Sequence, residues 1–160
     1  MSDDEDKSYE DSLKEIANEA NWSQKPDWFI EAIADLNLQA GIGYSLTFHT
    51  NGSLVSGELI SGETYFHELG NQISKTGRAS EGHENVIKVL SENMAKFSEI
   101  YTRRKELLNS DNSSGKARFI HLRETSVFFG NEEPINVGLW RGPLSEISGL
   151  SWGQLRASNV

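Results

Sequence analysis

The sequence predicts an α+β fold: a small antiparallel sheet of about five strands, an inserted long helix and N-terminal helices. Three observations support this. Apolar residues recur at helical spacing in residues 26–40 and 84–108. Residues 42–50 alternate in polarity, as a strand does, and β-branched and aromatic residues are frequent in 117–129. The dipeptide Asn51-Gly52 is a strong β-hairpin signal. The sheet is expected to be either open or closed as an SH3/Sm-like barrel.

The N-terminal half begins with helical patterns. A weak pattern runs from Tyr9 to Asn21, and a clearer one begins after it, where Pro26 suits a first helical turn and Gly41 is a stop signal. The apolar residues of the clearer helix are Phe29, Ile33, Leu36 and Ala40.

The first hairpin is expected to pair residues 42–50 with 53–61 and to bury one face. Gly57 in the returning strand predicts a bulge or a strong bend. Ser61 is placed to cap a following helix. The apolar residues of that helix are Tyr65, Phe66, Leu69 and Ile73.

A polar connection at residues 77–82 precedes the long helix predicted for 84–108. The loop at 109–115 contains no residue with an apolar side chain to bury. Strands are predicted at 117–129 and 137–141, with one or two short strands in 144–155. The long helix is expected to carry one apolar stripe formed by Val86 or Ile87, Leu90, Met94, Phe97, Tyr101 and Leu108.

Charge divides the chain into two parts. The net charge of the 160 residues is −9. Residues 1–20 contain eight acids and two lysines, which is −6, so the other 140 residues account for −3. We therefore expect an acidic, partly disordered tail at 1–20 and a single α+β domain at 21–160. The acidic balance argues against nucleic acid as a partner.

The chain contains no cysteine, which excludes disulfides and thiolate metal sites and favours a reducing compartment. Its first seven residues carry four acids and one lysine, unlike the basic start of a signal peptide. No apolar run approaches the ~20 residues that a membrane helix needs. These features predict a cytoplasmic protein without a membrane partner.

Catalytic and metal motifs are weak. A histidine pair from neighbouring strands, His49 and His121, is possible, but ordinary strand histidines are the better interpretation. Residues 149–153 match the G-x-S-x-G nucleophile pattern, yet no histidine follows them and only seven residues remain. We predict no enzyme activity, no cofactor and no metal site.

Aromatic residues are the better candidates for function. Four tryptophans occur in the chain, and Phe128-Phe129 cannot both face one core from a regular strand. Exposed aromatic side chains often anchor protein interfaces. The residues predicted to bind a partner are Phe128, Phe129, Trp140, Arg141 and Trp152.

Three stretches, in their order and spacing, resemble the gas-vesicle accessory protein U family. The matching blocks span roughly residues 42–70 and 117–156. They are Asn51-Gly52 with Ser56-Gly57-Glu58-Leu59-Ile60-Ser61 and Tyr65-Phe66; Phe119-Ile120-His121-Leu122 with Thr125 and Gly130; and Trp140-Arg141-Gly142 followed by Glu146, Gly149, Gly153 and Leu155.

The resemblance implies a non-catalytic accessory role in gas vesicles, the gas-filled protein shells that give prokaryotes buoyancy. Accessory proteins of this family are associated with vesicle assembly or clustering and act through contacts with the shell or with other gas-vesicle proteins. Self-association is also expected, because a short open sheet leaves edges to be covered. The alternative hypothesis is an Sm-like or OB-like small barrel that binds RNA or another ligand.

Overall fold

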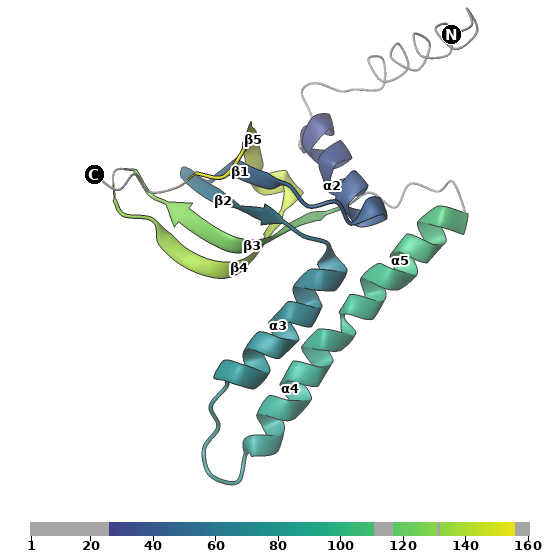
Figure 1. The fold of residues 1–160 in the computed structure, drawn as a ribbon, viewed down its shortest axis with the longest axis vertical. Coiled ribbons are helices and arrows are strands. Elements are labelled where there is room, and N and C mark those ends of the chain that lie inside the picture. The colour runs from purple at the N-terminus through teal and green to yellow at the C-terminus, as the bar shows by residue number, and fades with distance from the viewer. Residues whose placement is uncertain (1–25, 111–116, 131, 156–160) are drawn as a thin grey trace, which may run out of the picture.

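The computed structural model describes residues 26–110, 117–130 and 132–155, which form the expected α+β fold (Figure 1). The predicted acidic tail, the helical pattern at residues 9–21 and most of the predicted 109–115 loop lie outside the described residues. The elements, in chain order, are α2 (Trp28–Ala40), β1 (Ser45–Thr50), β2 (Ser53–Leu59), α3 (Gly62–Thr76), α4 (Glu84–Lys96), α5 (Ser98–Ser110), β3 (Phe119–Phe128), β4 (Ile135–Pro143), the 3₁₀ helix η1 (Leu144–Glu146) and β5 (Ile147–Trp152).

The sheet is open rather than closed. Its strand order is β4-β3-β2-β1-β5, and every neighbouring pair is antiparallel. A closed barrel needs its two edge strands to pair with each other. In the described sheet these edges are β4 and β5, which η1 joins end to end instead. Of the two expected forms, the small antiparallel sheet is therefore correct and the SH3/Sm-like barrel is wrong.

Local turn chemistry explains the first hairpin. Asn51 and Gly52 both have positive φ, 48° and 78°, which confirms the predicted hairpin turn. The bulge predicted at Gly57 is also confirmed, because the register of β2 against β3 shifts between Ser56 and Glu58. A Cβ at Gly57 would lie 2.8 Å from the carbonyl oxygen of Arg123, so only glycine fits this close approach of two backbones.

Helix α2 covers one face of the sheet and supplies part of the core. Asp27 caps it by accepting hydrogen bonds from the N–H groups of Phe29 (2.9 Å) and Ile30 (3.4 Å), so Pro26 precedes the cap rather than entering the first turn. Gly41, with φ 65°, ends the helix as predicted. The buried core comprises Ile30, Ile33, Ala34, Leu46, Phe48, Val55, Leu59, Ile120, Leu122, Val127, Leu144 and Ile147.

The second face of the first hairpin is also covered, which the predicted alternation of buried and exposed residues missed. Thr47 and Ser56 are 1% and 0% exposed, and their hydroxyl oxygens lie 2.9 Å apart. Thr47 donates to the carbonyl oxygen of Gly153 at 2.8 Å, and the N–H of Leu155 donates to Ser56 at 2.8 Å. The chain after β5 therefore packs on this face through polar groups rather than through an apolar layer.

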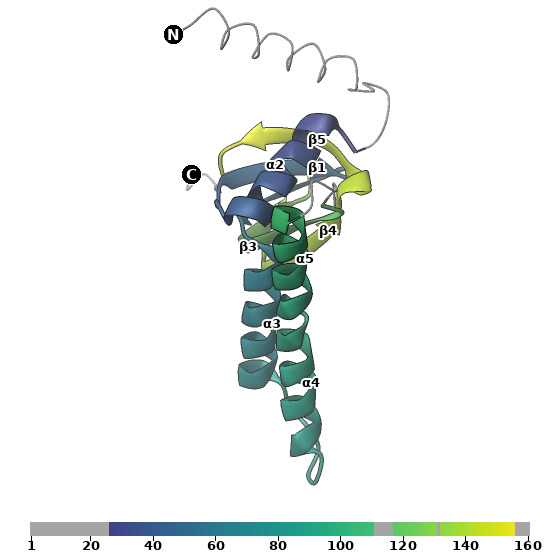
Figure 2. The ribbon, with the colours of Figure 1, turned by 90° about the vertical axis from the view of Figure 1, so that its right-hand side faces the viewer.

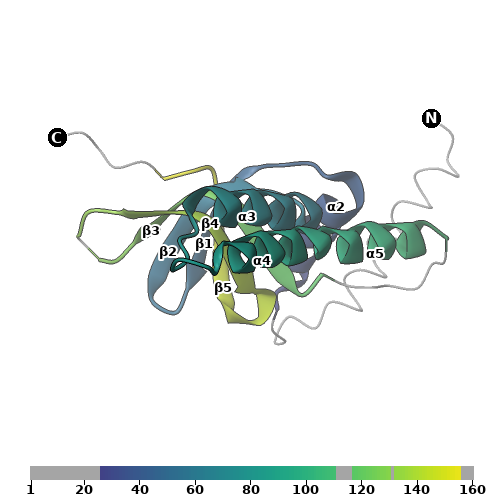
Figure 3. The same ribbon diagram turned by 90° about the horizontal axis from the view of Figure 1, so that it is seen from below.

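Helices α3, α4 and α5 form an arm that extends from the sheet, and we call it the helical arm (Figure 1). Figures 2 and 3 both show α3 and α4 side by side. Gly70 permits this close packing, because a Cβ there would lie 2.7 Å from the carbonyl oxygen of Ser91. No helix among the described residues is long and apolar enough to span a membrane.

An ion-pair group attaches the helical arm to the sheet. Arg123 of β3 donates to both carboxylate oxygens of Glu58, at 2.9 and 2.7 Å, and to Glu68 of α3 at 3.2 Å. The bonded guanidinium keeps the pKa of Glu58 below its ordinary value. The bidentate pair joins β3 to β2, and the single bond to Glu68 links this pair to α3.

The predicted long helix is two helices separated at Phe97. The N–H of Phe97 bonds to the carbonyl oxygen of Met94 at 3.2 Å, and that of Ile100 bonds to the carbonyl oxygen of Phe97 at 3.2 Å. Both bonds span three residues, which tightens the helix locally. The hydroxyl of Ser98 contributes to the break, because it donates to the carbonyl oxygen of Ala95 at 2.6 Å.

Candidate functional site

A mainly apolar row on the outside of the helical arm is the largest departure from the predicted burial. Its members recur at alternating steps of four and three residues, so they face one direction along both helices. Val86 and Ile100 are 56% and 57% exposed. Val89 lies beside the row and is also exposed. We call this row the outer seam; it consists of Val86, Leu90, Asn93, Phe97, Ile100 and Arg104.

A second row on the same helices packs against α3. A Cβ at Gly77 would touch Ile87, and one at Gly70 would touch Ser91 and Ala95. The single stripe predicted from the sequence therefore mixes two rows. Val86, Leu90 and Phe97 belong to the exposed outer seam, whereas Met94 and Tyr101 are half-buried. Leu108, the last member of the predicted stripe, lies beyond the side chains that the structure describes.

Two hollows lie along the outer seam. The one near the tip of the helical arm has a volume of about 360 Å³ and is formed by α4 alone. The other, of about 340 Å³, lies where α5 meets α3 and the sheet. We call the second the arginine hollow; it is lined by Phe66, Phe97, Ile100, Tyr101, Arg104, Arg118, Phe119 and Arg141.

The arginine hollow combines an apolar floor with positive charge. None of the described residues that line it is acidic. The guanidinium carbon of Arg141 lies 3.4 Å from the centre of the Phe119 ring and 6.0 Å from that of Phe66. This stacking holds the cation in a fixed orientation. The hollow is therefore suited to a ligand that carries both apolar groups and negative charge.

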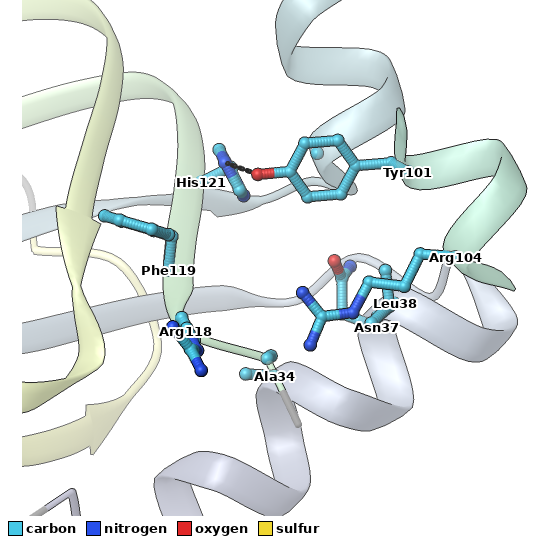
Figure 4. Close-up of a pocket in the computed structure, with 10 residues that line it drawn as sticks. Ala34, Asn37, Leu38, Tyr101, Arg104, Arg118, Phe119 and His121 are labelled. Atoms are coloured by element: carbon cyan, nitrogen blue, oxygen red, sulfur yellow. Dashed lines mark hydrogen bonds between the residues drawn. The ribbon is translucent and has the colours of Figure 1, made fainter. Parts of the chain in front are cut away.

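His121 is buried beside two residues that line the arginine hollow, Tyr101 and Arg141. The imidazole is 4% exposed, and its ring lies 4.9 Å from that of Tyr65 and 5.3 Å from that of Tyr101. Its Nε2 accepts a hydrogen bond from the Tyr101 hydroxyl at 3.3 Å, which Figure 4 shows, and one from Arg141 Nε at 3.3 Å. His121 therefore links α5, β3 and β4 as a neutral acceptor.

A small cavity of about 30 Å³ continues from the hollow toward α2. Figure 4 shows Ala34, Asn37 and Leu38 of α2 opposite Arg104 and Arg118 across this cavity. The space is on the scale of a single water molecule. The close-up thus shows α2, α5 and the beginning of β3 meeting at one point beside the arginine hollow.

Acidification is expected to destabilise the fold through His121. Burial, and secondarily the positive charge of Arg141, lower its pKa from 6.5 to about 3. Between these values the unfolded chain binds a proton that the folded chain does not, so the free energy of unfolding falls as the pH decreases. The expected loss from this residue is about 2 kcal/mol between about pH 6.5 and pH 5.

Urea unfolding at about pH 7.5 and pH 5 measures this loss. In His121→Gln, whose amide oxygen can still accept hydrogen bonds, the pH dependence should shrink by about that amount. An unchanged pH dependence in the variant would rule out His121 as its source.

The five residues predicted to bind a partner do not form one site. Arg141 lies in the arginine hollow, and Trp140 is half-buried against the core. Phe128 is half-buried and Phe129 is exposed at the end of β3. Trp152 is 64% exposed on β5, at the opposite edge of the sheet from β4, and its ring lies 5.0 Å from that of Tyr44.

Sequence reasoning missed most of the arginine hollow. Phe66, Phe97 and Tyr101 are in the predicted helices but were expected to face the core. Arg104 belongs to the basic run at 103–105, whose charge alone does not indicate a hollow. The available signal was the alternating spacing from Val86 to Arg104. It indicates a second row on the same helices, whereas one buried stripe requires only one row.

The residues of the motifs that resemble catalytic sequences are not arranged as in a catalytic site. Residues 149–152 of the G-x-S-x-G match lie in β5, without the strand-to-helix turn of a nucleophile elbow. Ser151 Oγ lies 3.4 Å from His49 Nε2 on an exposed surface, which is a long cross-strand contact. The alternative of a site that pairs His49 with His121 is excluded, since β2 separates their strands, and the preferred interpretation of ordinary strand histidines stands. No group of three potential metal-binding side chains gathers among the described residues.

Comparison with protein families identifies the chain. The model for the family described as gas vesicle protein GvpU-like matches residues 27–155, which include α2, the helical arm and all five strands. The match is thus longer than the two blocks that carried the sequence resemblance. Searches of curated proteins and of solved structures find no significant match. The chain belongs to the GvpU-like family of gas vesicle proteins.

Proposed function

We propose that this protein is a non-catalytic accessory protein that acts through protein–protein contacts in the assembly or clustering of gas vesicles in the cytoplasm. Family membership supports the association with gas-vesicle proteins. The observation that carries the proposed mode of action is the outer seam, which exposes the apolar residues Val86, Leu90, Phe97 and Ile100 on an arm that extends from the sheet (Figure 2).

The seam has the properties of a helix-binding surface. Its 3.5-residue period is the spacing by which helices pack along one another. Isolated exposed apolar residues are common on proteins, but a contiguous row marks an interaction site. Docking a helix or groove of a gas-vesicle protein on the seam would remove Val86, Leu90 and Ile100 from water.

A second contact would allow the protein to bridge two partners. Trp152 projects from β5, the edge strand opposite β4, and is more than half exposed. Together with Phe129 it is the exposed part of the aromatic set predicted from the sequence. We assign Trp152 to a separate contact, which suits a role in joining shells or in self-association.

Flotation of purified gas vesicles tests the proposal. Wild-type protein is expected to rise with the vesicles at low and high salt. Leu90→Glu with Ile100→Glu should lower the apparent affinity at least tenfold, because two carboxylates would have to be buried against the partner. Ile135→Glu with Val137→Glu on β4 is the matched control, since these residues are also exposed aliphatics.

The possible outcomes distinguish whether the protein binds vesicles from whether the outer seam is the surface that binds them. Wild-type protein that stays entirely in the subnatant at both salt concentrations would rule out vesicle binding. Binding of the seam variant at wild-type strength would show that the contact lies elsewhere. Equal losses in both variants would indicate a nonspecific effect of added negative charge.

One observation favours a second candidate, an RNA-binding protein. Arg118 and Arg141 beside Phe119 and Phe66 form a basic, aromatic-lined surface of the kind on which bases stack. The net charge of −9 opposes this function. Retention of a single-stranded RNA oligonucleotide in a filter-binding assay, lost in Arg118→Glu, would support it; no retention would end it.

A further inference from the structure

We propose that the acidic segment at residues 9–20 of this same chain docks in the arginine hollow and covers the adjacent part of the outer seam. The inference concerns the chain alone and does not depend on which gas-vesicle protein is the partner. It is argued from the chemistry of the hollow, from the composition of the segment and from the length of chain between them.

The hollow selects for an apolar and anionic occupant. Phe97 and Ile100 are 41% and 57% exposed, so covering them removes apolar surface from water. Arg118 and Arg141 are exposed at the edge of this apolar surface. Since the Arg141 guanidinium lies against Phe119, its planar geometry is already set for a carboxylate. RNA phosphates would pair with the two arginines. Bases stack on aromatic rings, however, so the aliphatic side chain of Ile100 would remain uncovered.

The segment at residues 9–20 has the matching composition. It contains Glu10, Asp11, Glu15 and Glu19 against Lys14, which gives a net charge of −3. Its apolar residues recur at steps of three and four, the spacing that places them on one face of a helix. They are Leu13, Ile16, Ala17 and Ala20.

The connection is long enough for docking within one molecule. Helix α2 begins at Trp28, and Ala34 of α2 lines the small cavity next to the hollow. The helical rise from Trp28 to Ala34 is only about 9 Å. Residues 21–25 can span up to about 17 Å when extended. Residues 9–20 can therefore reach Arg118 without displacing α2.

Docking would make the segment a competitor of any partner that uses the outer seam. Phe97, Ile100 and Arg104 belong to both the seam and the hollow. A bound segment would cover these residues and leave the tip of the helical arm, around Val86 and Leu90, accessible. Partner binding would then require displacement of the segment, which is an autoinhibitory arrangement.

Cross-linking in the full-length chain tests the contact, because the protein contains no cysteine of its own. A short bis-maleimide is expected to join Ile16→Cys to Ile100→Cys within one molecule in dilute solution. The control pair, Ile16→Cys with Val137→Cys, places the second thiol on β4, at an exposed aliphatic position outside the hollow. Gel mobility and peptide mass mapping should show at least a fivefold higher yield for the first pair.

Charge reversal provides a second, independent test of the contact. Arg118→Glu should lower the cross-linking yield several-fold, and adding Glu15→Lys to it should restore the yield. Arg78→Glu, an exposed reversal outside the hollow, should change nothing. Equal yields for the two cysteine pairs, insensitivity to Arg118→Glu, or cross-links only between molecules would overturn the proposal. RNA binding lost in Arg118→Glu, with cross-linking unaffected, would assign the hollow to RNA.

Discussion

Phe48→Ala is expected to lower the free energy of unfolding by about 3–5 kcal/mol, the largest effect that any single substitution considered for this chain should have. Phe48 lies in the central part of the sheet, on β1, and is 0% exposed. Truncation removes the apolar ring and leaves a cavity between α2 and the strands that the surrounding side chains can fill only in part. For a domain of marginal stability, this is a large share of the total.

Urea unfolding followed by circular dichroism measures the effect. Phe129→Ala is the matched control, since Phe129 is 44% exposed and should cost no more than about 0.5 kcal/mol. A loss below about 1 kcal/mol for Phe48→Ala would mean that the core is not centred on β1.

Gly62→Ala is expected to destabilise the fold by up to about 3 kcal/mol, although alanine is the better helix former. Gly62 begins α3, and a Cβ there would overlap the ring of Tyr101 on α5. The ring cannot move freely, because its hydroxyl bonds to His121 and its face contacts Phe66. The added methyl group should therefore push α5 away from the sheet and open the arginine hollow.

A double-mutant cycle identifies the cause of this destabilisation. In a Tyr101→Ala background the obstructing ring is absent, so Gly62→Ala should become neutral or stabilise by up to about 1 kcal/mol. The loss of stability should thus disappear or change sign in the Tyr101→Ala background. Equal losses in both would contradict the contact between Gly62 and Tyr101 as the source.

Several elements were predictable because their signals are local. The positive φ values of Asn51 and Gly52 follow from the turn that only such residues adopt easily. The capping side chain of Ser61 and the terminating Gly41 act within one helical turn. Gly57 marked its bulge because a strand glycine often allows another backbone to approach closely.

The candidate site was less predictable because it depends on contacts between distant segments. Arg141 of β4 and Phe119 of β3 meet through strand pairing, while Phe66 and Ile100 come from different helices. The apolar spacing in residues 84–108 indicated an amphipathic helix, but spacing does not show how many of its faces are covered. Among the described residues, α4 packs mainly on α3, so one of the two apolar rows stays exposed.

The sequence by itself therefore determined the α+β class, the first hairpin, the C-terminal end of α2 and the family resemblance, since these depend on residue type and short-range order. Only the tertiary structure decided that the sheet stays open, that Phe97 interrupts the long helix, and that His121 is buried beneath an arginine-rimmed hollow. The physical reason is that burial and charge proximity are properties of packing. Residues as far apart as Phe66 and Arg141 acquire a shared environment only when the chain has folded.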